Sequence, residues 1–129
     1  GVIDTNHKSM GEENDCAVRA ISEAYDITYK EAHVILESWG RVDNEGIYWK
    51  YIESGIRKDF PSSASELFII KRYITAFSFV NQIAESGYTY IVLADRHIFV
   101  IEEVSHEKWL VKGNLDDAPK QIIGYLKIN

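Results

Sequence analysis

One thiol in the sequence is placed where it could act as a nucleophile. Cys16 is the only cysteine, and it follows Asn14-Asp15 at the expected start of a helix. The positive end of a helix dipole lowers a thiol pKa, and the free N–H groups of the first turn can hold an oxyanion. The alternative is that Cys16 is a small buried apolar residue.

A nucleophilic cysteine needs a base, and His97 is the best placed of the four histidines. It opens the expected strand HIFVIEEV directly after the charged turn Asp95-Arg96, so its imidazole is expected at a sheet end, opposite a helix terminus. The alternative is a polar residue that marks a strand start. The other histidines are expected in an irregular segment, in a helix with apolar neighbours, and in an exposed turn: His7, His33 and His106.

A third polar group is needed to orient the imidazole. Asn114 follows the expected strand WLVK, and Asp116 and Asp117 come shortly after it. Any of the three can accept a hydrogen bond from the ring. The alternative is that GNLDDAP simply forms a turn, which its composition favours.

The bulk composition describes a single domain over residues 1–129, in which residues 1–11 are expected to be irregular or partly disordered. Apolar residues make up 46% and charged residues 26%, as in an ordinary globular protein. The net charge of −6 argues against nucleic-acid and anionic-membrane partners. A single cysteine cannot form an internal disulfide, which favours a reducing compartment and a cytoplasmic location. No apolar run reaches the length of a membrane span.

The order of the predicted elements is helices first and an antiparallel meander second, which is an α+β layout with helices packed on one side of a sheet. The best-defined helix is expected over 29–38, since Thr28 and Glu31 form a capping box. Three other helices are expected over 15–26, 47–54 and 75–85, and Gly55 is expected to end the one over 47–54. Strands are expected over 67–70, 88–93, 98–104, 108–112 and 121–128.

Metal and cofactor motifs are not evident in the sequence. The chain has no C-x-x-C or H-x-x-x-H spacing, so no metal site is expected. It has no P-loop and no G-x-G-x-x-G, so no nucleotide cofactor is expected.

The order of cysteine, histidine and asparagine resembles that of papain-like cysteine peptidases. The resemblance is closest to their minimal branch, which includes leader-trimming peptidase domains and short papain-like proteins of bacteria and bacteriophages. It spans residues 12–128. The residues that carry it are Asn14-Asp15-Cys16-Ala17-Val18-Arg19-Ala20, His97-Ile98-Phe99-Val100-Ile101, Gly113-Asn114 and the closing Ile123-Gly124-Tyr125-Leu126.

The resemblance implies a thiol hydrolase that cleaves a peptide or isopeptide bond in a peptide or protein substrate through an acyl-enzyme. Cys16 would attack, His97 would transfer the proton, and Asn114, or failing it Asp116, would hold the ring. These enzymes supply an oxyanion-hole amide from a glutamine shortly before the cysteine. Met10 stands there in this sequence, so Asn14, or Asn6, or the backbone alone would have to serve.

Two other functions stay open at this stage. An acyl transferase would use the same Cys16–His97 pair with an amine in place of water. A catalytically weak or inert protein of this fold would instead bind and block a partner, such as a host protein if the chain is encoded by a phage, in the host cytoplasm. Its anchors would be aromatic residues, although core packing is expected to account for most of them: Tyr25, Tyr29, Trp39, Tyr48, Trp49 and Tyr51.

Overall fold

The α+β class predicted from the sequence is confirmed. A computed structural model describes residues 14–63, 66–112 and 117–129. Its helices are α1 (Cys16–Tyr25), α2 (Tyr29–Ser38), α3 (Trp49–Asp59) and α4 (Ala76–Gln82). Its strands are β1 (Leu67–Ile69), β2 (Thr89–Ala94), β3 (His97–Ser105), β4 (Lys108–Lys112) and β5 (Gly124–Ile128).

The five strands form one antiparallel sheet in the order β1-β5-β2-β3-β4. The hairpins β2–β3 and β3–β4 are those predicted from the sequence. The simple meander is wrong for β5, which returns to lie between β1 and β2 and does not pair with β4. This pairing sets Leu126 opposite Ile91, so their side chains enter the same core.

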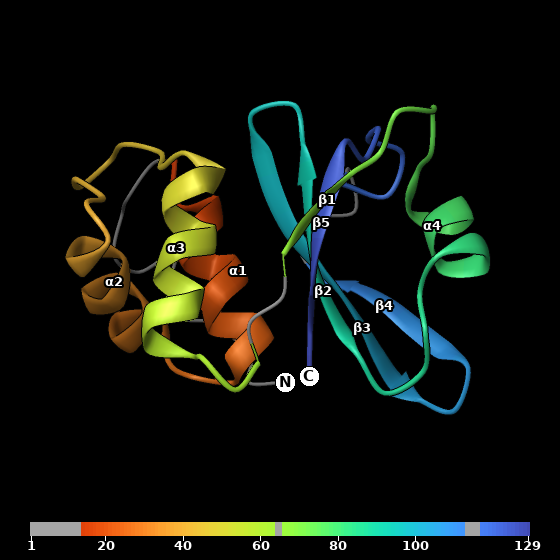
Figure 1. Cartoon of the computed structure of the whole chain (residues 1–129), viewed down its shortest axis with the longest axis horizontal. Helices are drawn as coiled ribbons and strands as arrows, with labels where there is room; N and C mark the ends of the chain where they lie inside the picture. The colour runs from red at the N-terminus through yellow and green to blue at the C-terminus, as the bar shows by residue number, and fades with distance from the viewer. Residues whose placement is uncertain (1–13, 64–65, 113–116) are drawn as a thin grey trace.

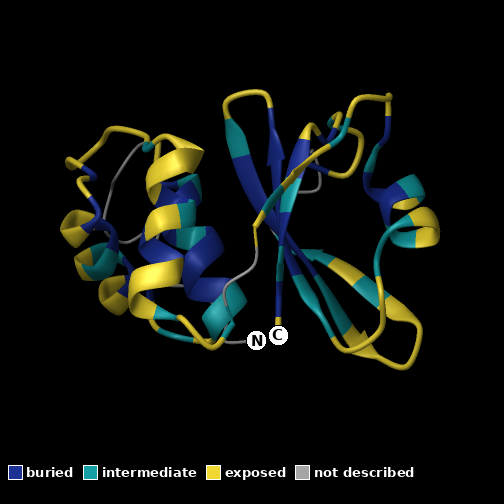
Figure 2. Ribbon diagram, in the orientation of Figure 1, coloured by how far each residue is buried: buried dark blue, intermediate teal, exposed yellow. Residues whose placement is uncertain are grey.

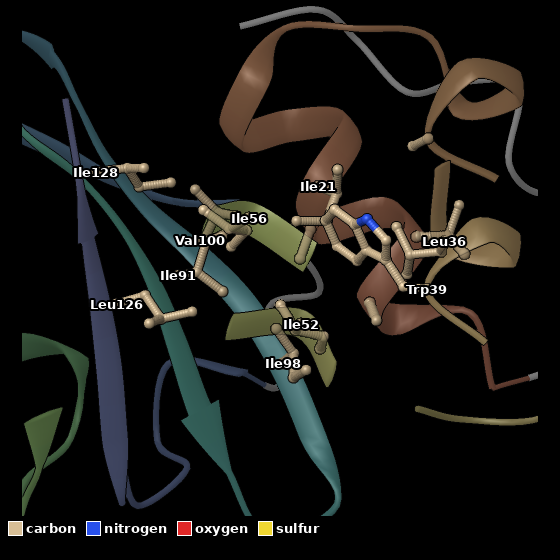
Figure 3. Packing of buried hydrophobic residues seen from close by; sticks show 14 of the residues in the cluster. Ile21, Leu36, Trp39, Ile52, Ile56, Ile91, Ile98, Val100, Leu126 and Ile128 are labelled. Atoms are coloured by element: carbon tan, nitrogen blue, oxygen red, sulfur yellow. The ribbon is translucent and has the colours of Figure 1, made fainter. Parts of the chain in front are cut away.

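Helices cover both faces of the sheet (Figure 1). On one face, α1, α2 and α3 close a core with alternate residues of β2, β3 and β5 (Figure 3), among them Ile21, Leu36, Ile52, Ile91 and Val100. On the other face, Phe79 of α4 packs against the remaining alternate residues, which include Tyr90, Val92, Phe99 and Ile101. Figure 2 shows the buried residues along β2 and β5 between these layers. The prediction that helices lie on one side of the sheet is therefore right for α1–α3 and wrong for α4.

Two helix ends show how local and tertiary forces compete. The capping box of α2 is confirmed: the hydroxyl of Thr28 accepts the backbone N–H of Glu31, and the Glu31 carboxylate accepts that of Thr28, each at 3.1 Å. By contrast, α3 does not end at Gly55 and continues to Asp59. Gly55 is buried against the indole ring of Trp39, which a side chain at position 55 would overlap.

The aromatic residues of the helical layer divide into buried and exposed groups. Tyr29 and Trp39 are buried, and the ring of Tyr25 stacks on Phe60 with centroids 3.9 Å apart. Core packing therefore accounts for these three. It does not account for the other three, which are exposed: Tyr48, Trp49 and Tyr51. Within the described ranges, none of the helices has the length and apolar character that a membrane crossing requires.

Candidate active site

Two chemically reactive side chains meet where the helical layer faces the sheet. Cys16 is the first residue of α1, and His97 is the first residue of β3, directly after the two-residue turn of the β2–β3 hairpin. The start of α1 and the tip of this hairpin lie at the same end of the molecule (Figure 1). The Cys16 sulfur is hydrogen-bonded to the His97 imidazole and accepts the backbone N–H of Ile98. The structure thus brings together the thiol and the imidazole that the sequence singled out.

The surroundings of Cys16 favour its ionised form. Partial burial of the thiol opposes ionisation, but other effects outweigh it: the hydrogen bonds from His97 and from the Ile98 N–H, and the positive charges of His97 and Arg19. Together they place the pKa of Cys16 below its ordinary value. A thiol with a lowered pKa that is neither fully buried nor disulfide-bonded is the kind that attacks electrophiles.

Contacts on two sides of the His97 ring favour its charged form. Its hydrogen bond to Cys16 raises the pKa of His97, burial lowers it, and the adjacent carboxylate of Asp117 raises it again, so that the net shift is upward. Nε2 of His97 lies 2.9 Å from Oδ1 of Asp117. Because one ring nitrogen faces this carboxylate, Nδ1 is the nitrogen that remains for the thiol. A lowered thiol pKa beside a raised imidazole pKa favours a thiolate next to an imidazolium.

Asp117 is the third polar group at this site. It is only 1% exposed, and its Oδ1 also lies 3.1 Å from Nζ of Lys120. In the sequence, Asp117 is only one of three neighbouring residues that could accept a hydrogen bond from the imidazole. The two preferred ones, Asn114 and Asp116, lie outside the described residues. Sequence spacing alone cannot separate three polar residues that lie so close together along the chain.

The residues just before Cys16 anchor the start of α1. Asp15 is the N-cap, but its side chain makes no capping hydrogen bond. Its buried carboxylate accepts the hydroxyl of Tyr29 at 3.0 Å and lies 3.1 Å from Nε of Arg19. Since the cap side chain points elsewhere, it does not occupy the N–H groups of the first turn. Nothing in the local sequence pattern indicated the contact with Tyr29.

Asn14, expected to support an oxyanion, also has a structural contact. Its backbone is in the left-handed region, with φ of 54°. Its side-chain amide donates to the carbonyl of Asn44 at 3.0 Å, which ties the start of α1 to the loop before α3. Met10 and Asn6, the other positions considered for an oxyanion-hole residue, lie outside the described residues.

Cys16 and His97 open onto a groove of about 630 Å³ between the two layers, within the range of small-molecule and peptide sites. One wall comes from the helical layer, with Asn14, Ala17 and residues 45–49, and the other from the sheet, with Leu93, Ala94, Arg96, Ile98 and Ile123. Behind the pair is a cavity of about 10 Å³, the size of one water molecule. It is lined by the charged side chains of Arg19, Glu23, Lys112 and Asp117.

His33, Glu37 and Asp43 are the described residues whose possible metal-ligating atoms lie close together, within 4.8 Å. Nδ1 of His33 lies 3.7 Å from a Glu37 oxygen, whereas Nε2 lies 3.2 Å from an Asp43 oxygen. A metal ion takes one imidazole nitrogen, so these carboxylates on different ring edges fit an ion pair with His33 better than a metal site. Cys16 and His97 take no part in this group.

The fold and the site together define a class of protein. It is an α+β domain in which a thiol contacts an imidazole at a groove, and the imidazole contacts a buried carboxylate. Such a set can carry out nucleophilic catalysis on a carbonyl group. Comparisons of the chain with protein-family models, with curated proteins and with solved structures find no match.

Proposed function

We propose that this chain is a papain-like thiol hydrolase that cleaves a peptide or isopeptide bond through an acyl-enzyme. The observation that carries the proposal is the chain of contacts from Cys16 to His97 to Asp117 at a groove large enough for a peptide. The order of these residues along the chain supports it further, because it resembles that of papain-like peptidases. In this proposal Asp117 takes the role that the resemblance implied for Asn114.

The chemistry proceeds in two halves. The Cys16 thiolate attacks the substrate carbonyl carbon, and the bond from this carbon to nitrogen breaks as His97 gives its proton to the departing amine. A thioester between substrate and Cys16 remains. Water then attacks the thioester while neutral His97 takes a proton from it, and the carboxylic acid leaves as the Cys16 thiolate and the protonated imidazole form again. Asp117 stabilises the imidazolium in each half.

The tetrahedral intermediates need donors for their oxyanion. The N–H groups of the first turn of α1 suit this task, because they sit beside the sulfur and the Asp15 side chain does not cap them. Removal of one oxyanion donor typically costs about 10²- to 10³-fold in rate, so a missing glutamine amide lowers the rate without abolishing the reaction.

A pH-dependent alkylation profile of the lone thiol tests the proposal. Iodoacetamide should label Cys16 rapidly below pH 7, and His97→Ala should shift the labelling curve toward that of an ordinary thiol. His106→Ala is the matched control, because that ring is exposed in the β3–β4 turn and has no contact with the site. Slow labelling that His97→Ala does not change would contradict the activated thiol. Hydrolysis of a peptide mixture that Cys16→Ala abolishes would complete the test.

A protein-binding role is the second candidate, favoured by the exposed aromatic residues at the groove. Tyr48 is 77% and Trp49 41% exposed, and both line the helical wall. Such residues are typical anchors of binding interfaces. This role does not need the thiol, so a Cys16→Ala variant that keeps the full biological effect would favour it. Release of an acylated amine in place of the free acid would indicate transfer by the same pair.

A further inference from the structure

The β2–β3 hairpin brings one charged side chain to the groove beside the thiol–imidazole pair. Ala94 pairs with His97, so the hairpin loop consists of Asp95 and Arg96 alone. Arg96 is exposed and lines the groove next to His97. No ion pair or hydrogen bond joins its guanidinium to any part of the chain that the structure describes. Among the described residues, Arg96 therefore has no ion-pair partner, and the carboxylate that also lines the groove, Glu45, lies on the helical wall.

The backbone of Arg96 adopts a conformation that is costly for an arginine. Its φ is 53°, in the left-handed region that glycine and asparagine occupy at least cost. Two-residue hairpin loops favour those residues where φ is positive. An arginine in this conformation is therefore strained. Glu107 has a similar φ of 58° in the β3–β4 turn, away from the groove, which provides a matched control.

The chemistry of the proposed reaction decides which part of a substrate Arg96 would meet. His97 gives its proton to the departing nitrogen, so the leaving group must lie on the His97 side of the sulfur. Arg96 directly precedes His97 and lies on the same wall. The two other cations near the sulfur already have carboxylate partners: Arg19 pairs with Asp15, and Lys112 with Glu102. Among the described residues that line the groove, Arg96 is thus the Lys or Arg side chain available to a substrate.

We infer that Arg96 recognises a negative charge on the leaving group, so that the preferred substrates are amides whose departing amine carries a carboxylate. This inference rests on the proposed function and names its substrate class. The carboxylate can be the free carboxyl end of a C-terminal residue, or the side chain of an aspartate or glutamate that follows the scissile bond. A guanidinium binds either one with paired hydrogen bonds.

Two alkylating agents test the site without a known substrate. Iodoacetate and iodoacetamide share the reactive carbon and differ in charge. The ratio of their rates at Cys16 should fall about fivefold in Arg96→Asn, which corresponds to about 1 kcal/mol. The rate ratio should stay close to that of the parent protein in Arg96→Lys and should not change in Glu107→Asn. Because asparagine tolerates the left-handed backbone, Arg96→Asn should also raise the melting temperature by about 3 °C.

Peptide pairs complete the experiment and separate its two possible failures. One pair differs in a free or amidated C-terminal residue after the scissile bond, the other in glutamate or glutamine at that position. A preference for the anionic member that Arg96→Asn removes supports the inference, and the pair that shows it identifies the carboxylate. Cleavage with no such preference, together with an unchanged alkylation ratio, overturns the inference and leaves the hydrolase intact. An alkylation ratio that depends on Arg96, without cleavage of any peptide, supports the anion site and contradicts the hydrolase. A Cys16 thiol that reacts with neither iodoacetate nor iodoacetamide overturns both the anion site and the hydrolase.

Discussion

Asp117→Asn tests the carboxylate that holds the imidazole. The substitution keeps the shape of the side chain and an oxygen that can accept from Nε2 of His97, and it removes the negative charge. That charge raises the pKa of His97, whose own charge lowers the pKa of Cys16. Removal of the charge should therefore make the thiolate–imidazolium pair less stable, and this change can be measured at the sulfur.

The expected size follows from the geometry around Asp117. Two unit charges 4 Å apart interact by about 4 kcal/mol at an effective dielectric constant of 20. The value is discounted here, because Lys120 offsets part of the field of Asp117 and the His97 side chain is 18% exposed. A net loss of about 1–2 kcal/mol remains, since charged hydrogen bonds exceed neutral ones by about that much. At pH values below the thiol pKa, the thiolate fraction should fall about 5- to 30-fold.

The assay compares the two reactions of Cys16 in one variant. Alkylation by iodoacetamide requires only the thiolate and should slow by the factor just given. Hydrolysis also requires an oriented ring for proton transfer, so kcat/KM should fall further, by about 10²-fold or more. Asp95→Asn makes the same chemical change at an exposed position in the turn before His97 and is the control. Alkylation and hydrolysis within about twofold of the parent protein, in a folded Asp117→Asn variant, would refute this role of the carboxylate.

Three further outcomes are expected. Gly55→Ala should destabilise the fold by about 1–3 kcal/mol in urea unfolding, because the new methyl group overlaps the Trp39 ring. The control Ser54→Ala, on the exposed side of α3, should be neutral or stabilising. An equal gain in stability in both variants would contradict the packing of Gly55 against Trp39. Tyr29→Phe should cost about 1–3 kcal/mol in the same experiment, since buried Asp15 loses a hydroxyl donor, and an unchanged midpoint would show that this hydrogen bond contributes nothing. Hydrolysis should show a bell-shaped pH profile. The rate should fall in acid as the Cys16 thiolate, whose pKa is lowered, is protonated, and in alkali as the His97 imidazolium, whose pKa is raised, loses its proton. A rate that only rises with pH, at the pKa of an ordinary thiol, would argue against the thiolate–imidazolium pair.

Local sequence patterns predicted most of the elements and failed where distant parts of the chain decide. The capping box at Thr28 is complete within a few residues, and both ends of α2 match the prediction. Gly55 is a stop signal in the sequence, but burial against Trp39 makes glycine a packing requirement within the helix. Alternating apolar residues fix which side of β5 faces the core, and they contain no information on which strand lies beside it.

The site follows the same division. The positions of Cys16 at a helix start and His97 at a strand start are local features, so both were identified. Their contact depends on how the helical layer packs on the sheet, which the order of elements suggested only through a family resemblance. The partner of the imidazole was left among three residues of one turn, of which the structure places Asp117 against the ring. The role inferred for Arg96 depends on its position in the groove and on the absence of a described partner, and neither is written in the sequence.

The layered construction couples the reactivity of the thiol to the packing of the core. The thiol is fixed to the helical layer, where Asp15 contacts Tyr29, and the imidazole is fixed to the sheet end. The hydrogen bonds from His97 and Ile98 to the sulfur cross between these layers, so they lengthen if the layers shift. Interiors are densely packed, and a cavity between layers is filled by small movements of both. Loss of apolar contact between α1 and β3 should therefore slow alkylation of Cys16 while most of the protein is still folded.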